Sequence, residues 1–293
     1  MNPHATCVIG AGAVGSSLAL RLSDSGYPIR AVLSRTRASS ETVAARIPSA
    51  VVIERVQDIP QECRLILLCV PDDELERSTV TLAVARDRWQ GSFVAHVSGV
   101  HSIDVLAPIA DRGGSTFGFH PIQTFPRRFD PDAFNGCYVG IEGDGDADDY
   151  GRALAMAIGA HPVMVASEDK LAYHLAASVA SNHLVALLVM IERLADKRAP
   201  GSEWDLASFV PLIERTLQNA LADGPSAALT GPVVRGDAAT VARHLEVFEK
   251  QDPASREAYQ ALSRLLVEVA TACNRLAPEA RNAVIEALET ARD

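Results

Sequence analysis

The chain has 293 residues, enough for one large or two smaller domains, and its 48% hydrophobic and 22% charged residues are typical of a folded globular protein. Its net charge of −10 argues against nucleic acid and against an anionic membrane surface as partners. An anionic cofactor would therefore have to be held by local positive groups.

Neither a secretion signal nor a membrane span is expected. The N-terminal residues lack the basic and long apolar segments of a signal peptide, and the longest apolar run, residues 184–191, is too short to cross a bilayer. The five cysteines are scattered, odd in number and free of C-x-x-C spacing. This usage is typical of reduced, mostly buried thiols and predicts a cytoplasmic protein.

A short apolar run, residues 7–9, leads directly into the glycine turn GAGAVG and then into a helical pattern over 16–25. The order strand, turn, helix with G-x-G-x-x-G spacing predicts dinucleotide binding, with phosphates on free N–H groups at the positive helix end. The first glycine permits the sharp turn, the second lets a diphosphate approach, and the third lets the helix pack closely. The residues expected to bind the cofactor here are Gly10, Gly12, Ala13, Val14 and Gly15.

The end of the second predicted strand, residues 29–33, indicates which dinucleotide binds. An NAD site usually has Asp or Glu here, to accept from the ribose 2′-hydroxyl. This chain instead has Ser34, Arg35 and Thr36, whose hydroxyls and guanidinium can bind a 2′-phosphate. We therefore expect NADP(H) rather than NAD(H), the alternative being a solvated loop.

Strand signals continue at 51–53, 65–70 and 93–97. The continuous apolar run at 65–70 is typical of a central parallel strand, and Asp72 or Asp73 can cap the helix that follows. Ligands of such sheets bind at the carboxyl ends of the strands. Candidate walls of the cofactor site are therefore Val70, Pro71, Ser98 and Gly99, unless these are ordinary strand-to-helix turns.

A further strand-like segment, 115–118, leads into His120, a polar residue between apolar neighbours and a candidate for the catalytic cleft. A lone histidine can equally be a satisfied structural residue. Another strand is expected at 137–141, followed by an acidic turn, 142–149, that is predicted to be solvated. The turn lacks the spacing of a calcium loop, so no metal is expected.

The sequence changes character near residue 166. After a helix at 147–159 and a short strand at 162–165, the pattern becomes helical, with almost no strand signal. We expect an α/β Rossmann domain with a mostly parallel sheet over 1–166 and an all-α domain that contributes to the substrate site over 167–293. The expected helices of the second part cover residues 167–195, 202–222, 238–250, 254–274 and 278–291, with Asp237 as an N-cap.

Polar residues recur every four positions on the first of these helices, at Lys170, His174, Ser178 and Asn182. Such a stripe on an otherwise buried helix is costly unless it lines a cavity or forms a polar network between helices or subunits. In the catalytic interpretation, His174 or else Lys170 donates a proton, and Asn182 orients the substrate carbonyl or the carboxamide. Ser178 would contact the substrate.

A rigid loop with two breakers, residues 229–237, carries Arg235, which could hold a substrate carboxylate with two hydrogen bonds. Such loops are more often simple connections.

Taken together, the glycine turn, Ser34-Arg35, the HPIQTF segment at 120–125, the polar helix and the loop at 230–237 resemble a known family. Its members are bacterial two-domain proteins with a Rossmann-like N-terminal domain and a helical C-terminal domain of unassigned function. They are related to pyrroline-5-carboxylate reductase and to 6-phosphogluconate and 3-hydroxyisobutyrate dehydrogenases. The resemblance covers essentially the whole chain. The wider superfamily commonly has Lys-x-x-x-Asn on this helix, whereas here His174 follows Lys170, so its mechanism does not transfer directly.

The resemblance implies an NADP(H)-dependent oxidoreductase that dimerises through its helical domain. Some members are similar to ketopantoate reductases, which makes 2-dehydropantoate the first substrate to test. The resulting hypothesis is an NADPH-dependent reductase of a small carbonyl compound that carries a carboxylate. The alternatives are an imine reductase of the pyrroline-5-carboxylate type and a non-catalytic NADP(H)-binding sensor.

Overall fold

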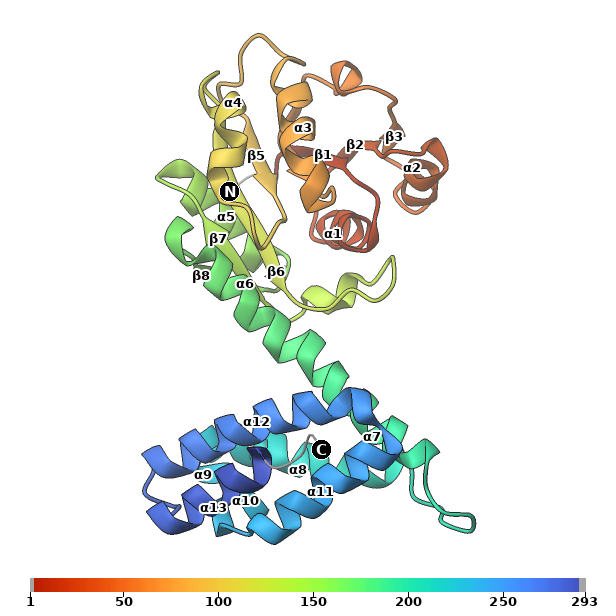
Figure 1. The fold of residues 1–293 in the computed structure, drawn as a ribbon. Coiled ribbons are helices and arrows are strands. Elements are labelled where there is room, and N and C mark those ends of the chain that lie inside the picture. Colours follow the sequence, from red (N-terminus) through yellow and green to blue (C-terminus); the bar gives the residue numbers. More distant parts are fainter. Residues whose placement is uncertain (1–2, 290–293) are drawn as a thin grey trace. The chain divides into compact units, whose positions relative to one another are not determined.

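A computed structural model describes residues 3–289 of the chain (Figure 1). These residues form two compact units, divided between Ser181 and Asn182. The last strand ends at Met164, so the change from mixed to helical structure occurs close to the position expected from the sequence. The two units are described separately below.

The first unit is built on one eight-stranded sheet with the order β3-β2-β1-β4-β5-β6-β7-β8. Every neighbouring pair is parallel except β6–β7, which is antiparallel, so the expected mostly parallel α/β sheet is confirmed. The strands are β1 (Ala5–Ile9), β2 (Ile29–Leu33), β3 (Val51–Val52), β4 (Cys63–Leu68), β5 (Phe93–His96), β6 (Ser115–Ile122), β7 (Tyr138–Glu142) and β8 (His161–Met164).

Helices cover both faces of this sheet because its central strands are apolar on both sides (Figure 1). Leu65 and Leu67 of β4 pack into one core with α1 (Ala13–Asp24) and α5 (Asp146–Ala157), whereas Ile66 packs into the opposite core with α3 (Asp72–Ala83). The other helical segments of this unit are α2 (Arg37–Ala44), α4 (Ala107–Ala110) and the 3₁₀ turns η1 (Val56–Asp58), η2 (Ile103–Leu106) and η3 (Pro131–Phe134).

Two local predictions were wrong in detail. The N-cap of α3 is Pro71, which makes no side-chain capping bond, and Asp72 and Asp73 lie instead in the first turn, where their charge complements the helix dipole. β6 is longer than expected because it continues through residues 119–122 by pairing with β7. His120 therefore lies within a strand rather than in a loop beyond one.

The segment expected as one α-helix over 167–195 has four parts. They are the 3₁₀ turn η4 (Ser167–Asp169), α6 (Lys170–Ser178), the π-helical η5 (Val179–His183) and α7 (Leu184–Asp196). A π turn contains more residues than an α turn, so the four-residue spacing that relates Lys170 to Ser178 does not extend to Asn182. Single π turns inside α-helices are frequent at functional sites.

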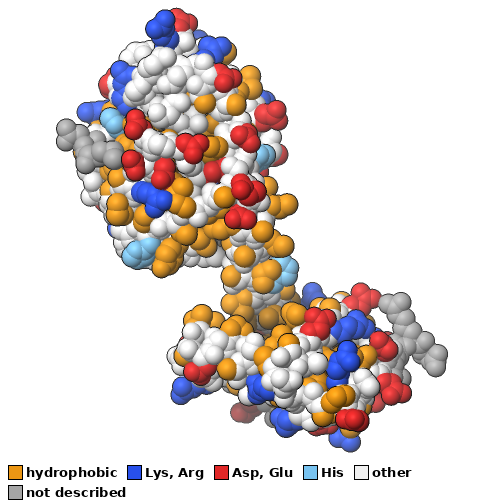
Figure 2. Space-filling view, turned by 90° about the vertical axis from the view of Figure 1, so that its left-hand side faces the viewer, with side chains coloured by type: hydrophobic (Ala, Val, Ile, Leu, Met, Phe, Trp, Pro, Cys, Tyr) orange, Lys and Arg blue, Asp and Glu red, His pale blue; other side chains and the backbone are white. Residues whose placement is uncertain are grey.

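This helical segment is exposed in the single chain, contrary to the expected burial. Leu171, Leu175 and Val179 are 69%, 59% and 53% exposed, and Figure 2 shows hydrophobic side chains gathered along the segment. By length and composition alone, Ser167–Asp196 could also cross a membrane, contrary to the expectation from the short apolar run. One such helix is weak evidence for a membrane span, since subunit interfaces have similar composition.

The second unit is helical and has its own apolar core, which includes Val241, Leu245, Val267 and Val284. The Asp237 carboxylate accepts a hydrogen bond from the Thr240 N–H, which confirms the predicted N-cap. Besides α7, its helices are α8 (Leu206–Asp223), α9 (Pro225–Ala228), α10 (Pro232–Arg235), α11 (Ala238–Gln251), α12 (Pro253–Ala272) and α13 (Pro278–Glu289). The predicted end of the last helix at residue 291 lies outside the described residues.

Candidate functional site

The glycine turn between β1 and α1 has the shape needed to receive a phosphate. Gly10 has φ +103°, and a Cβ there would overlap the Cys69 carbonyl oxygen at the end of β4. A Cβ at Gly15 would overlap the Gly10 carbonyl oxygen, so α1 can pack this closely only without a side chain. Gly12 has no heavy atom within 4 Å of the equivalent position, which leaves its Cα open to a ligand.

The start of α1 is free to bind an anion. Gly12 is the N-cap and makes no side-chain capping bond, and the first turn of the helix has no acidic residue. The N–H groups of Ala13 and Val14 therefore lie at the positive end of the helix dipole, and no carboxylate in the first turn offsets that partial charge. The turn fits the diphosphate of a dinucleotide.

The end of β2 lies beside this turn, where the sequence predicts recognition of a 2′-phosphate. The Ala11 N–H donates to the Ser34 Oγ, and Thr36 caps α2 by accepting from the Ser39 N–H. Arg37 is bound to Glu41 and Glu54, a carboxylate pair that the sequence did not reveal. Arg35 is exposed and has no carboxylate partner among residues 3–289, so its guanidinium is available for a phosphate.

The strand register places polar groups along one edge of the sheet. Leu68, His96, Gly118 and Glu142 are consecutive partners across β4, β5, β6 and β7. This row marks the carboxyl ends of β4 and β5, which is where ligands of open parallel sheets bind. β6 continues beyond the row and carries His120 past it.

Two imidazoles lie against the backbone of Gly99, just beyond β5. A Cβ at Gly99 would fall within 3 Å of both His120 Nε2 and His174 Nδ1, and the two rings are 5.9 Å apart. His174 Nδ1 is buried and has no hydrogen-bond partner among the described residues. The first unit thus brings three predicted site residues together and leaves one of them with an unsatisfied polar atom.

Tyr173 positions the His120 ring. Its hydroxyl lies 2.9 Å from His120 Nδ1 and also donates to the His120 carbonyl oxygen at 3.4 Å. Burial lowers the pKa of His120 to about 4, with further lowering by Lys170 and His174, and burial raises the pKa of Tyr173. At neutral pH, His120 is therefore a neutral imidazole and Tyr173 keeps its proton.

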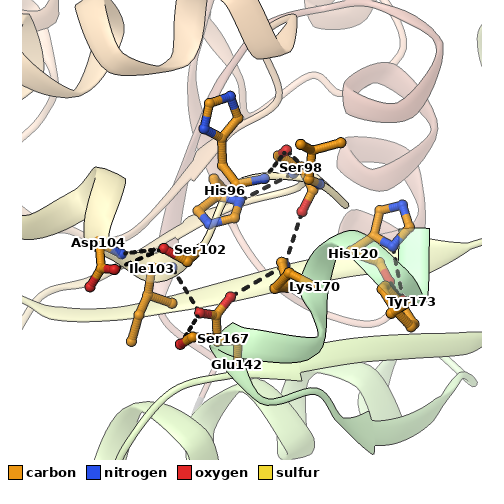
Figure 3. A network of polar contacts seen from close by, with 12 residues as sticks. His96, Ser98, Ser102, Ile103, Asp104, His120, Glu142, Ser167, Lys170 and Tyr173 are labelled. Carbon is orange, nitrogen blue, oxygen red and sulfur yellow. Dashed lines mark hydrogen bonds and ion pairs between the residues drawn. The ribbon is translucent and has the colours of Figure 1, made fainter. Parts of the chain in front are cut away.

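Lys170 is buried and paired rather than solvated (Figure 3). Its ammonium lies 3.3 Å from Glu142 Oε2 and donates to the Ser98 carbonyl oxygen at 3.2 Å. Glu142 Oε1 accepts from the Ile103 N–H at 3.0 Å and from the Ser167 hydroxyl at 2.7 Å. Glu142 is thus a buried member of the site, not part of a solvated turn as the sequence suggested.

The Ser98 hydroxyl is occupied by the loop itself, because it accepts from the Val100 and His101 N–H groups at 3.1 Å. The backbone N–H of Ser98 donates to Nδ1 of His96, which is fully buried. Burial is the main reason that the pKa of His96 is lowered to about 3. The hydroxyl and amide of Ser98 therefore shape the turn, and its carbonyl oxygen is fixed by Lys170.

The remaining predicted residues lie elsewhere in the described structure. Val70 follows β4 and Pro71 begins α3, next to the Cys69 carbonyl that packs on Gly10. Ser178 is the last residue of α6. Asn182 and Arg235 belong to the second unit, in η5 and in the last turn of α10. No group of three or more potential metal ligands occurs among residues 3–289.

Sequence reasoning missed Glu142, Tyr173 and His96. Glu142 is preceded by an apolar strand and followed by acidic residues, so local sequence associated it with the turn. Tyr173 adjoins His174, which was recognised, but its hydrogen bond to His120 joins residues far apart in the chain. The His96 ring accepts from the Ser98 N–H only two residues away, so its role is local. Only the position of His96 at the end of a predicted strand could have drawn attention to it.

The mostly parallel sheet and its glycine turn define a Rossmann-like first unit, and comparison with known families agrees. Residues 4–121 match the model of the Rossmann-like domain, and residues 137–266 match the family described as Domain of unknown function (DUF2520). The chain thus matches a Rossmann-like model over its N-terminal part and the DUF2520 model over much of the remainder, which confirms the predicted resemblance. No curated protein matches the chain significantly.

Several solved structures share the fold of almost the whole chain. A "putative NADP oxidoreductase" from Bacteroides fragilis is 23% identical with a TM-score of 0.74, over 90% of this chain and 98% of that one. A reductive aminase from Aspergillus terreus, in complex with NADPH and ethyl-5-oxohexanoate, is 16% identical with a TM-score of 0.70, over 97% and 99%. An imine reductase from Streptomyces aurantiacus is 19% identical with a TM-score of 0.65, over 98% and 100%.

The lowered pKa values of His96 and His120 predict loss of stability in mild acid. Both rings are neutral when folded, whereas in the unfolded chain they take up a proton near the ordinary pKa of 6.5. The unfolded state binds more protons below that value, so the free energy of unfolding should fall as pH decreases from about 6.5 to about 4. Thermal unfolding measured from pH 7 to pH 4 checks this.

His120→Gln should remove part of this pH dependence, whereas the same change at the exposed His161 should not. An unfolding midpoint that stays constant between pH 7 and pH 4 would contradict the interpretation.

Proposed function

We propose that the protein is an NADPH-dependent reductase of a small carbonyl or imine compound. The observation that carries the proposal is the open glycine turn at the free start of α1, on the same sheet edge as the His120, His174 and Tyr173 cluster. The NADP(H) and imine chemistry named for structural neighbours supports it.

The residues of the first unit fit a phosphorylated dinucleotide. The N–H groups after Gly12 would hold the diphosphate, and Ser34, Arg35 and Thr36 would hold a 2′-phosphate. Val70–Pro71 and Ser98–Gly99 are proposed as walls for the ribose and nicotinamide. The cofactor, when bound, supplies the hydride, and the protein supplies orientation and a proton.

The protein's own contribution to catalysis is a set of hydrogen-bond donors. His174 is the proposed proton donor because its buried Nδ1 has no partner among the described residues. His120, held by Tyr173 and neutral at pH 7, would hydrogen-bond the reacting oxygen or nitrogen. Asn182 is proposed to orient the carbonyl or the carboxamide, and Ser178 and Arg235 to bind the substrate, Arg235 at its carboxylate.

Two substrate classes follow from these groups. A small ketoacid such as 2-dehydropantoate would suit hydrogen-bond donors near the carbonyl and an arginine for its carboxylate. A cyclic imine such as pyrroline-5-carboxylate is the second candidate, favoured by the reductive aminase and imine reductase among the structural neighbours.

The experiment is NADPH oxidation across a panel of ketoacids and imines that includes both compounds. We expect turnover of at least one, and a loss in kcat of about 100-fold for His174→Ala, the usual contribution of a positioned general acid. Asn182→Ala should also reduce turnover, and His161→Ala, a surface control, should not. NADPH binding without turnover of any compound, unaltered by His174→Ala plus Asn182→Ala, would instead indicate a cofactor sensor.

Arg35 should determine the choice of cofactor. Replacing it by Gln removes a charge-assisted bond to the 2′-phosphate, so NADPH affinity should fall by about tenfold or more while NADH affinity stays the same. Arg37→Gln is the matched control, because Glu41 and Glu54 already bind that guanidinium. Calorimetry with both cofactors measures the difference, and equal NADPH affinity in wild type and Arg35→Gln would refute the assignment.

We also propose that the protein is a cytoplasmic homodimer formed through its exposed apolar helices. Leu171, Leu175 and Val179 are more than half exposed, and a second copy would bury them. Light scattering after size exclusion should give a dimer, and Leu175→Glu should give a monomer or a misfolded chain. Val51→Glu, which also changes an exposed apolar residue, should remain dimeric. Association of wild type with lipid vesicles would point to a membrane partner instead.

A further inference from the structure

The ion pair between Lys170 and Glu142 is almost completely withdrawn from solvent. The two side chains are 3% and 4% exposed, and the ammonium lies 3.3 Å from Glu142 Oε2. Burying two charges is costly unless further hydrogen bonds compensate for the lost water. Gly118 leaves room for the pair, because a Cβ there would lie 3.4 Å from the Lys170 ammonium and 3.3 Å from the Glu142 Cβ.

The compensating bonds tie three separate parts of the first unit together (Figure 3). Lys170, at the start of α6, donates to the Ser98 carbonyl oxygen just beyond β5. Glu142, at the end of β7, accepts from the Ile103 N–H on the same loop as Ser98 and from the Ser167 hydroxyl before α6. The loop 98–103 is therefore attached at both ends to one buried pair of charges.

The next residue after the fixed carbonyl is Gly99, against which His120 Nε2 and His174 Nδ1 lie. We propose that Lys170, supported by Glu142, is a positioning residue that fixes the Ser98–Gly99 backbone between these two imidazoles. This inference rests on the proposed reductase function. In it, Lys170 holds the Ser98–Gly99 backbone that is proposed to contact the nicotinamide, and Lys170 is not the proton donor.

The contacts of Lys170 favour this role over proton donation. The Lys170 ammonium already donates to the Ser98 carbonyl and is paired with the Glu142 carboxylate. The side chain is also too buried to exchange a proton readily with solvent. His174, in contrast, has an unpartnered Nδ1 beside Gly99. A proton can therefore reach a bound substrate from His174 without breaking the buried ion pair.

The test compares Lys170→Met with the double variant Lys170→Met plus Glu142→Gln. The single variant leaves a buried carboxylate without its cation, so its unfolding midpoint should fall by about 10 °C. The double variant replaces the ion pair by neutral groups, and the new amide oxygen can still accept from Ile103 and Ser167. We expect it to recover at least half of that loss, which makes it the form in which function is measured.

In the double variant the Ser98 carbonyl has lost its ammonium. Amide hydrogen exchange in residues 97–103, measured without cofactor, should be at least about fivefold faster than in wild type. NADPH should bind roughly tenfold more weakly, and kcat/KM should fall by about 10- to 100-fold. The pH dependence of kcat/KM should keep its shape, because the proton donor is still present. The single variant Lys170→Arg, which keeps a cation at this position, should bind NADPH more tightly than the double variant does.

Unchanged exchange in 97–103 together with unchanged NADPH affinity would overturn the proposal. So would the loss of a limb of the pH profile, since that would make Lys170 the proton donor. Arg152→Met, which removes a partly exposed cation paired with Asp148 on α5, is the matched control and should alter none of these readings. If wild type binds no NADPH, the reductase function fails, and the exchange measurement still decides whether Lys170 holds the loop.

Discussion

The close approach of β1, α1 and β4 at the glycine turn is the constraint on which the first unit of the structure depends. Gly10 has a backbone conformation that favours glycine and faces the Cys69 carbonyl, while Gly15 faces the carbonyl of Gly10. A side chain at either position would push α1 away from the sheet. The same packing brings the uncapped start of α1 to the carboxyl edge of β1 and β4, so one steric requirement both shapes the fold and leaves this helix start open to an anion.

Strand length and direction build the rest of the site on that edge. Leu68, His96, Gly118 and Glu142 lie in one row, yet β6 runs past the row and β7 returns antiparallel to end on it. His120 is carried beyond the edge by the extra length of β6. Glu142 lies in the row because β7 begins beside Ile122, beyond the edge, and runs back to end beside Gly118.

The parts that the sequence predicted are those that local patterns determine. The glycine spacing, the apolar run of β4 and the Asp237 cap each depend on a few neighbouring residues, and each is found in the structure. Lys170 could not be assigned from its neighbours, because its burial depends on Glu142, which is 28 residues earlier in the chain. For the same reason Glu142 was mistaken for a solvated residue.

The helical segment after the sheet illustrates a different limit. Polar residues four positions apart lie on one face only where the segment is α-helical. After Ser178 the segment becomes the π-helical η5, so the repeat no longer places Asn182 on that face. Apart from its polar stripe, this helix was expected to be buried, yet in a single chain its Leu171, Leu175 and Val179 side chains are exposed. An amphipathic pattern predicts that the apolar face of a helix is buried. It does not predict whether the same chain, a second copy or a membrane covers that face. The net charge of −10 disfavours an anionic membrane, which supports the proposal that a second copy covers this surface.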